Sequence, residues 1–177
     1  SLSEIQEAFS VEPLNKEFYD KIVRAFYSLV GGEVGTGRNK ETLEANLTLP
    51  GGTKDRTIER QFGTRLVGRI IFCWFLKHKA SGNGISLIPN GWISSKSVSD
   101  NYYHGILETL FFEILNKSTE ERPKNLPDGH ELIPFLNGGL FEPQIGADSD
   151  YYQLREPKAN YQLKIADSWF KELFEIL

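Results

Sequence analysis

The chain has 177 residues, of which 40% are apolar and 25% charged, and its formal net charge is −4. This length suits one domain with a substantial core, and the composition is not that of an intrinsically disordered chain. The negative balance excludes a globally basic surface, so any contact with DNA needs a local patch of basic residues.

Three features bear on the compartment and on the extent of the chain. The single cysteine, Cys73, lies in an apolar run, which predicts a buried, unreactive thiol in a reducing environment. The longest apolar run, residues 70–76, is far shorter than the roughly 20 residues that cross a bilayer, so we expect a cytoplasmic protein with no membrane partner. Methionine is absent and the chain ends within a helical pattern, which indicates a fragment of a longer polypeptide.

Residues 14–30 carry apolar side chains about every four positions, the spacing of one helical face. Gly31 and Gly32 follow, as glycine does where a helix ends. The next stretch, residues 31–52, is rich in glycine and predicts a flexible loop, with a short helical turn at 40–46 as one interpretation. A phosphate-binding loop is disfavoured, because no strand precedes these glycines and no Gly-Lys-Ser/Thr follows them.

Residues 54–79 predict the central helix of the fold. Their apolar positions form a wide stripe, and the last two turns are apolar on nearly every side, so other elements should surround this helix. Gly63 and Gly68 each cost about 1 kcal/mol relative to alanine inside a helix. We therefore expect another element to approach closely at both positions.

The remaining elements alternate loop and helix. Residues 80–100 predict a loop pinned by Trp92 and Ile93, residues 103–115 a second amphipathic helix, and residues from about 167 a final helix. A small hairpin between 151–154 and 161–165 is a further interpretation. The predicted fold is therefore mainly α: an irregular helical domain around a central buried helix, with long loops and room for one small β-hairpin near the C-terminal end.

The decapeptide 133–142, IPFLNGGLFE, is the most distinctive stretch of the chain. Its two glycines can take positive φ, which residues with a Cβ avoid, and Pro134 biases its neighbour towards an extended conformation. The decapeptide predicts a tight turn that holds four apolar side chains against the core: Phe135, Leu136, Leu140 and Phe141.

Basic residues concentrate on the central helix. Residues 54–79 contain seven basic and two acidic side chains, a local charge of +5, which favours contact with DNA phosphates. At about 100° per residue the cluster divides between two sides of the helix, and a solvated face with intramolecular ion pairs is the alternative interpretation. The candidate DNA-binding residues are Arg56, Arg60, Arg65, Lys77 and Lys79.

No other motif predicts chemistry. The histidines His78, His104 and His130 lie in different elements without a partner three or four positions away, which argues against a zinc site. Residues 127–131, PDGHE, resemble the start of a nuclease carboxylate motif but lack the Glu-x-Lys that should follow. Because no glycine-rich strand–turn–helix is present either, we expect no catalytic, metal-binding or cofactor-binding residue in this chain.

Four segments, in this order, resemble one known family. They are residues 9–19 (FSVEPLNKEFY), residues 65–77 (RLVGRIIFCWFLK), residues 101–116 (NYYHGILETLFFEILN) and the decapeptide. Their order and spacing are similar to the region that joins nuclease to methyltransferase in fused type IIG restriction–modification enzymes. The resemblance extends from about residue 9 to the end of the chain.

The resemblance implies a division of labour. In that family one polypeptide carries a Mg²⁺-dependent nuclease, a helical connector, an adenine methyltransferase that uses S-adenosylmethionine, and a target-recognition region. Residues 1–177 would be a single connector domain, with the nuclease upstream and the methyltransferase downstream. Mg²⁺, S-adenosylmethionine and double-stranded DNA would then belong to the parent enzyme, and the chain alone would not be an enzyme.

Two alternatives remain open at this point. The first alternative to the connector is a stand-alone helical module that contacts the DNA backbone through the five candidate residues. The second is an unrelated helical domain whose aromatic surfaces bind a protein. A salt titration of DNA binding separates the first from a pure scaffold. The reading frame beyond residue 177 separates both from the connector.

Overall fold

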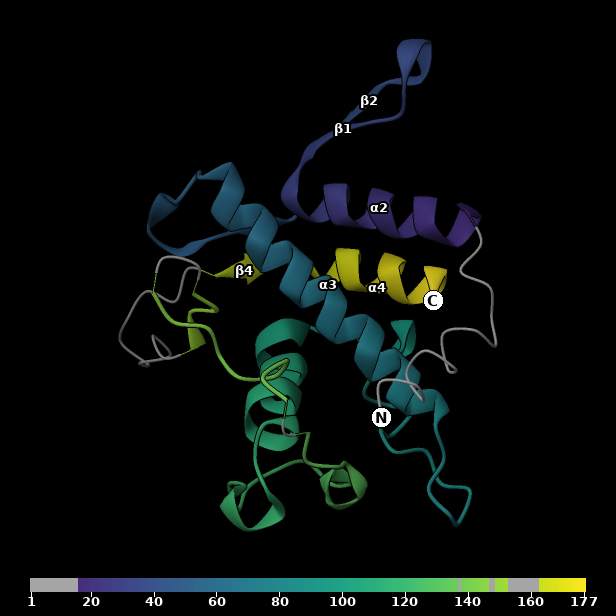
Figure 1. The fold of residues 1–177 in the computed structure, drawn as a ribbon, viewed down its shortest axis with the longest axis vertical. Coiled ribbons are helices and arrows are strands. Elements are labelled where there is room, and N and C mark those ends of the chain that lie inside the picture. Colours follow the sequence, from purple (N-terminus) through teal and green to yellow (C-terminus); the bar gives the residue numbers. More distant parts are fainter. Residues whose placement is uncertain (1–15, 137, 147–148, 153–162) are drawn as a thin grey trace.

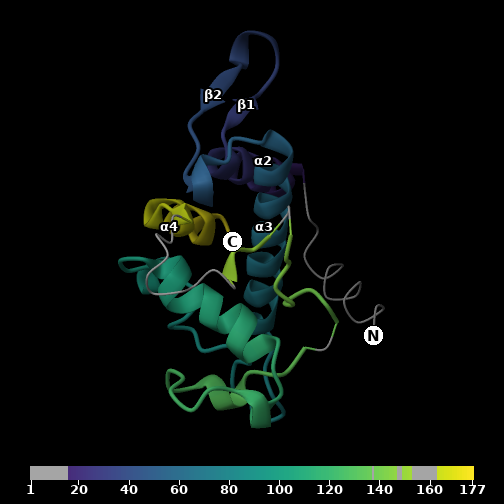
Figure 2. The same cartoon turned by 90° about the vertical axis from the view of Figure 1, so that its left-hand side faces the viewer.

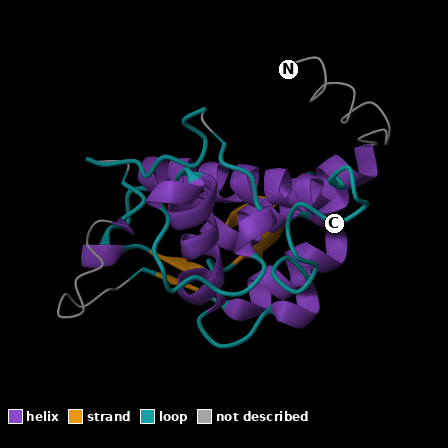
Figure 3. Ribbon diagram, turned by 90° about the horizontal axis from the view of Figure 1, so that it is seen from below, coloured by secondary structure: helices purple, strands orange, loops and turns teal. Residues whose placement is uncertain are grey.

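The computed structural model describes residues 16–136, 138–146, 149–152 and 163–177, and this part of the chain is predominantly helical (Figure 3), as the sequence predicted. The α-helices are α2 (Lys16–Val30), α3 (Arg56–His78) and α4 (Asp167–Ile176). Two segments with the wider i to i+5 hydrogen-bond pattern, Tyr103–Leu107 and Thr109–Leu115, form the fourth long helical element. Single 3₁₀ turns lie at Gly37–Asn39, Pro50–Gly52, Ser95–Ser97, Thr119–Glu121 and His130–Leu132.

Helix α2 confirms the prediction for residues 14–30 within the described range, which begins at Lys16. The helix ends at Gly31, which takes φ 76° and donates its N–H to the carbonyl oxygen of Tyr27 over 2.7 Å. Figure 1 shows α2 and α4 side by side, with α3 crossing them. The first and last described helices therefore pack on one another.

The glycine-rich stretch after α2 is a β-hairpin, and both expectations for it were wrong. Strand β1 (Gly32–Val34) pairs antiparallel with β2 (Glu41–Leu43), so residues 40–46 hold a strand where a helical turn was an interpretation. Gly35 turns the chain at φ 84°, in the region that favours glycine. The hairpin projects from the rest of the molecule in both Figure 1 and Figure 2.

A second strand pair joins distant parts of the chain. Strand β3 (Leu47–Thr48) pairs antiparallel with β4 (Lys164–Ile165). The sequence predicted that residues 161–165 pair with 151–154, and this is wrong for Lys164 and Ile165, which pair with β3. Residues 153, 154, 161 and 162 of the predicted hairpin lie outside the described range. Strand β4 leads directly into α4, so this pairing positions the last helix.

Helix α3 is the centre of the fold, as predicted. Asp55 caps its N-terminus by accepting hydrogen bonds from the N–H groups of Thr57 (2.8 Å) and Ile58 (3.3 Å). A Cβ on Gly63 would lie 2.7 Å from Val30, so α2 does approach closely there. The same expectation for Gly68 was wrong, because nothing lies within 4 Å of a Cβ built at that position.

An aromatic core lies between α4 and the helical segments around residue 107. Tyr102 is buried, donates its hydroxyl to the carbonyl oxygen of Trp92 over 2.6 Å, and meets Phe170 with ring centroids 5.1 Å apart. Trp92 and Ile93 are buried, which confirms that they pin the preceding loop. No helix among the described residues is long and apolar enough to cross a membrane.

The decapeptide does turn, but it splits its side chains between core and solvent. Gly139 takes φ 77°, and Phe141 is buried against Phe72 and Phe111 at centroid distances of 5.9 and 5.6 Å. Phe135 and Leu140 are exposed, which corrects the prediction that they face the core. Asn137 lies outside the described residues.

Candidate functional site

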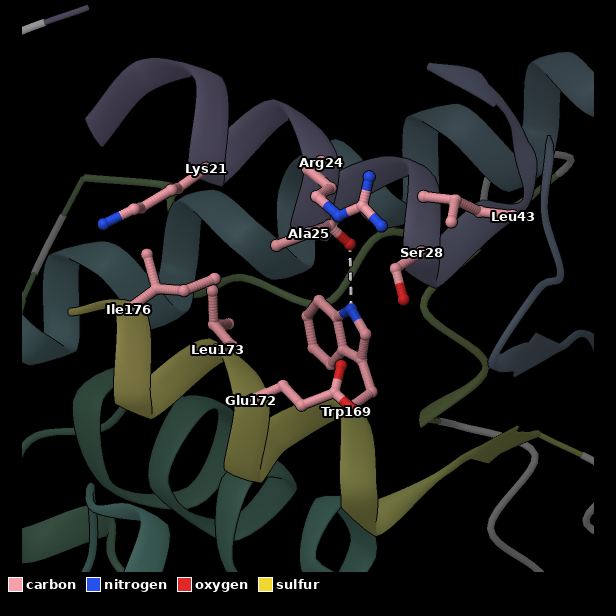
Figure 4. A pocket seen from close by; sticks show the side chains of 9 residues that line it. All are labelled: Lys21, Arg24, Ala25, Ser28, Leu43, Trp169, Glu172, Leu173 and Ile176. Carbon is pink, nitrogen blue, oxygen red and sulfur yellow. Dashed lines mark hydrogen bonds between the residues drawn. The ribbon is translucent and has the colours of Figure 1, made fainter. Parts of the chain in front are cut away.

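A groove lies between α2 and α4 on the described surface (Figure 4). Its volume is about 400 Å³. The floor is formed by Trp169, whose indole N–H donates to the carbonyl oxygen of Ala25 over 2.9 Å and locks the ring across the two helices. The lining is mostly apolar with a charged rim: Lys21, Arg24, Ala25, Ser28, Leu43, Trp169, Glu172, Leu173 and Ile176.

The rim of this groove carries an exposed ion pair. Arg24 lies 2.8 Å from Glu41 of strand β2, and both side chains are about half exposed. The hydrogen bond from Arg24, together with its charge, holds the pKa of Glu41 below its ordinary value. The groove therefore offers apolar contact area and surface charge, and no group poised for catalysis.

A buried cluster of charges lies on the other side of α3. Asp150 is buried and accepts from Arg69 Nη2 at 3.0 Å and from Arg65 Nε at 3.1 Å. Its Oδ2 also accepts the N–H of Gln144 at 2.8 Å. The guanidinium carbon of Arg69 lies 5.1 Å from the ring centroid of Phe112, within cation–π range. A buried pair needs such additional partners to offset its desolvation.

The same cluster fixes the main chain of the decapeptide. Arg69 donates from Nε to the carbonyl oxygen of Leu140 over 2.8 Å and from Nη2 to that of Glu142 over 3.1 Å. Arg122 donates to the carbonyl oxygens of His130 (2.8 Å) and Ile133 (2.7 Å) on the other side of the turn. Two arginines thus hold this segment by its backbone.

Three of the five candidate DNA-binding side chains are engaged within the domain. Arg56 donates to the carbonyl oxygens of Val30 (2.5 Å) and Gly31 (2.6 Å) and pairs with Glu59. Arg65 contacts Asp150, as above. Lys77 donates to the carbonyl oxygen of Ile93 over 2.6 Å, and partial burial lowers its pKa.

The other two, Arg60 and Lys79, are exposed. Within the described ranges neither donates a side-chain hydrogen bond to another residue. Arg60 borders a shallow hollow of about 460 Å³ on the outer face of α3, lined by Thr57, Arg60, Gln61, Thr64 and Arg65. The five predicted residues therefore form two groups, three that are bonded within the domain and two that are exposed.

The histidines have structural partners. His104 bonds to the buried carboxylate of Glu108 and, through Nε2, to the carbonyl oxygen of Leu163 at 2.7 Å. His78 contacts the carbonyl oxygen of Trp74 at 2.8 Å, and His130 that of Pro127 at 3.0 Å. Across the described residues no group of three or more His, Cys, Asp or Glu could hold a metal ion.

The single thiol is buried, as predicted. Cys73 is fully buried on the core face of α3, and burial raises the pKa of its thiol, a shift that the nearby charge of Arg69 only partly opposes. A thiol held in its protonated form is a poor nucleophile. We therefore assign Cys73 to the core.

The sequence reasoning missed the buried polar residues Arg69, Glu108, Arg122 and Asp150. Arg69 left a signal, because it shares the helical stripe of Phe62, Leu66 and Cys73, all of which are buried. An arginine on a core-facing stripe implies a buried acceptor. Nothing local to Asp150 identifies it as that acceptor.

A family model matches residues 90–171, and its description is "Domain of unknown function (DUF7814)". The match covers the second amphipathic helix, the decapeptide and the start of α4. It is less than half of the chain. No solved structure shows a significant match to this chain.

One similar protein comes from Methanocaldococcus jannaschii and is named as a candidate type II restriction enzyme and methyltransferase. The two sequences are 26% identical over 149 residues. The match covers 73% of this chain but 12% of the relative, so the chain corresponds to a small part of a much longer protein. At this identity the relative is distant.

Proposed function

We propose that this chain is a non-catalytic helical connector that couples nuclease and adenine methyltransferase modules in a type IIG restriction–modification enzyme. One observation carries the proposal: most of the chain is similar to a small part of a long protein whose name combines restriction and methylation. The four segments that resemble the type IIG family support the finer assignment.

The described side chains are consistent with that role. The buried charges of Arg69, Arg122 and Asp150 are directed at main-chain groups and at each other. The described residues do not fit Mg²⁺, since they hold no metal-competent cluster. The sequence likewise has no glycine-rich strand–turn–helix for S-adenosylmethionine. Both groups, and the chemistry they supply, are assigned to the rest of the parent polypeptide.

The experiment compares two polypeptides on the same duplex DNA with Mg²⁺ and labelled S-adenosylmethionine. The full-length product of the reading frame should transfer methyl groups to adenine and cut unmodified DNA, whereas the 177-residue chain should do neither. Cleavage or methyl transfer by the short chain would contradict the proposal. So would a reading frame that encodes no cofactor-binding module beyond residue 177.

We also propose that the connector touches the DNA backbone through two exposed cations, Arg60 in α3 and Lys79 just after the C-terminal end of α3. It rests on the exposure of Arg60 and Lys79, which, unlike Arg56, Arg65 and Lys77, need give up no hydrogen bond to a described residue to reach a phosphate. Each lost phosphate contact lowers the slope of log affinity against log salt by roughly 0.9.

The test is a salt titration of duplex binding by the Arg60→Gln and Lys79→Gln variants. Each variant should reduce the slope of log affinity against log salt by roughly 0.9, the value for one phosphate contact. Lys171→Gln, on the exposed side of α4, is the matched control and should leave the slope unchanged. If all three variants have the same slope, Arg60 and Lys79 do not contact DNA phosphates and this second proposal is wrong.

A further inference from the structure

Exposed apolar side chains gather in one segment of the chain. Six large apolar side chains are exposed among the described residues, and four of them fall within residues 132–145. Their exposed fractions are substantial: Leu132 51%, Phe135 43%, Leu140 42% and Ile145 63%. We name residues 132–136 and 138–145 the apolar loop. Contiguous exposed apolar patches mark interaction sites in soluble proteins.

Hydrogen bonds and one buried side chain fix the apolar loop to the rest of the domain. Its carbonyl groups at Ile133, Leu140 and Glu142 are bound by buried arginines, as described above. The N–H of Leu136 donates to the carbonyl oxygen of Leu115 over 2.8 Å, and Phe141 is buried in the core. A surface ordered in advance loses less conformational entropy when a partner binds.

The charge pattern of the loop limits the kind of partner. Glu142 is its one charged residue, and it contains no lysine or arginine. A DNA-binding surface needs cations to neutralise phosphates, and an acidic, cation-free loop opposes them. The centre of a protein–protein interface, in contrast, is depleted in charge and rich in aromatic residues.

From this geometry we infer that the apolar loop docks onto an apolar surface of another folded module in the same polypeptide. This inference rests on the proposed function and names the surface through which the connector makes contact. We expect the binding partner in the same polypeptide because the match covers only 12% of the relative. The rest of so long a polypeptide offers other folded modules to which the loop can bind. The loop also lies inside residues 90–171, the range that the family model matches.

The first experiment is photo-crosslinking in the full-length polypeptide. Phe135→benzoylphenylalanine places the crosslinker in the loop, and Tyr19→benzoylphenylalanine on α2 is a control at a more exposed aromatic position. Crosslinks from position 135, but not from 19, to peptides outside residues 1–177 of the same molecule support the docking. Crosslinks to DNA or to a second copy of the chain overturn it.

The second experiment separates docking from folding. Leu140→Ser should leave the thermal midpoint of the 177-residue chain unchanged, because the side chain is exposed. In the full-length polypeptide it should speed proteolytic separation of the modules about tenfold, the loss expected when an interface anchor is removed. Ile85→Ser, at an exposed apolar residue outside the loop, is the matched control.

Equal proteolysis of the two variants would overturn the docking site while leaving the connector intact. The proposed function fails in a different way, through a reading frame without further modules or a short chain with activity. The two failures are therefore distinguishable.

Discussion

Two arginines of α3 hold two segments by the same chemistry in different surroundings. Arg56 binds the carbonyl oxygens of Val30 and Gly31 at the base of the β1–β2 hairpin, with its side chain 47% exposed. Arg69 binds those of Leu140 and Glu142 in the apolar loop, with its side chain 3% exposed. The hairpin has its own strand pairing and a polar sequence, so it needs only a light, solvent-screened attachment.

Among the described residues the apolar loop pairs with no strand, and it carries exposed apolar groups that water would drive inward. Its geometry therefore depends on a buried guanidinium, which in turn requires the carboxylate of Asp150. Burying a guanidinium costs desolvation free energy. The fold buries one at the apolar loop, whose apolar side chains must be kept exposed, and not at the hairpin. The variants below test that ranking.

The largest effect should come from Asp150→Asn. The substitution leaves Arg65 and Arg69 without the carboxylate that neutralises them, and breaking a buried pair in this way costs about 3–5 kcal/mol. Urea unfolding measures the change in the free energy of unfolding. Asp128→Asn, at an exposed position, is the control and should stay within about 0.5 kcal/mol. Equal losses for the two variants would show that the cluster is not an anchor.

Gly63 and Gly68 lie between Arg56 and Arg69 on α3, and alanine at the two positions should change the free energy of unfolding in opposite directions. Gly63→Ala places a Cβ 2.7 Å from Val30, at the α2 contact beside the hairpin base, and should destabilise by about 1–3 kcal/mol. Gly68→Ala meets nothing within 4 Å and should stabilise by up to about 1 kcal/mol through helix propensity. Thermal unfolding of both variants decides whether α2 really limits the first position.

Arg56→Ala should cost about 1 kcal/mol, because its hydrogen bonds to Val30 and Gly31 are made by a half-exposed group. The loss should be local: hydrogen exchange should quicken at the amides of β1 and β2 and remain slow in the apolar loop. Arg56→Lys keeps the charge without the planar fork and should recover only part of the protection. A global loss of protection would remove the distinction between the two arginines.

The smallest effect belongs to Glu41→Gln at the edge of the hairpin. The pKa of Glu41 is lowered in the folded state, so its pairing with Arg24 stabilises the fold above the unfolded pKa. That contribution is lost as the pH falls through the folded pKa. The variant should therefore flatten the pH dependence of unfolding slightly in the acid range, and 1 M salt should erase the difference. An effect as large as that of Arg56→Ala would contradict the ranking.

The sequence predicted the parts of the fold that depend on local periodicity. Helices α2, α3 and α4 follow from their apolar spacing, and Trp92 and Ile93 were correctly placed in the core. The strands escaped prediction because three-residue and two-residue segments carry too little pattern. The pairing of β3 with β4 joins residues far apart in the chain, which no local signal encodes.

The candidate site was less predictable for the same reason. Helical spacing predicted that the basic residues divide between two sides of α3, but it could not show which of them find carbonyl or carboxylate acceptors. Arg69 could have been found from its stripe, whereas Asp150 is 81 positions away in the chain and no local pattern pairs the two residues. Exposure of Phe135 and Leu140 was missed because a glycine turn gives no indication of which side chains face outward.

The antiparallel packing of α2 and α4 has a consequence for the shape of any larger assembly. Lys21 lies opposite Ile176 and Ala25 opposite Trp169 (Figure 4), so the outer ends of the two helices lie on the same side of the domain (Figure 1). Under the proposed function, a segment that continues from the C-terminal end of α4 therefore leaves the domain on the side at which α2 begins.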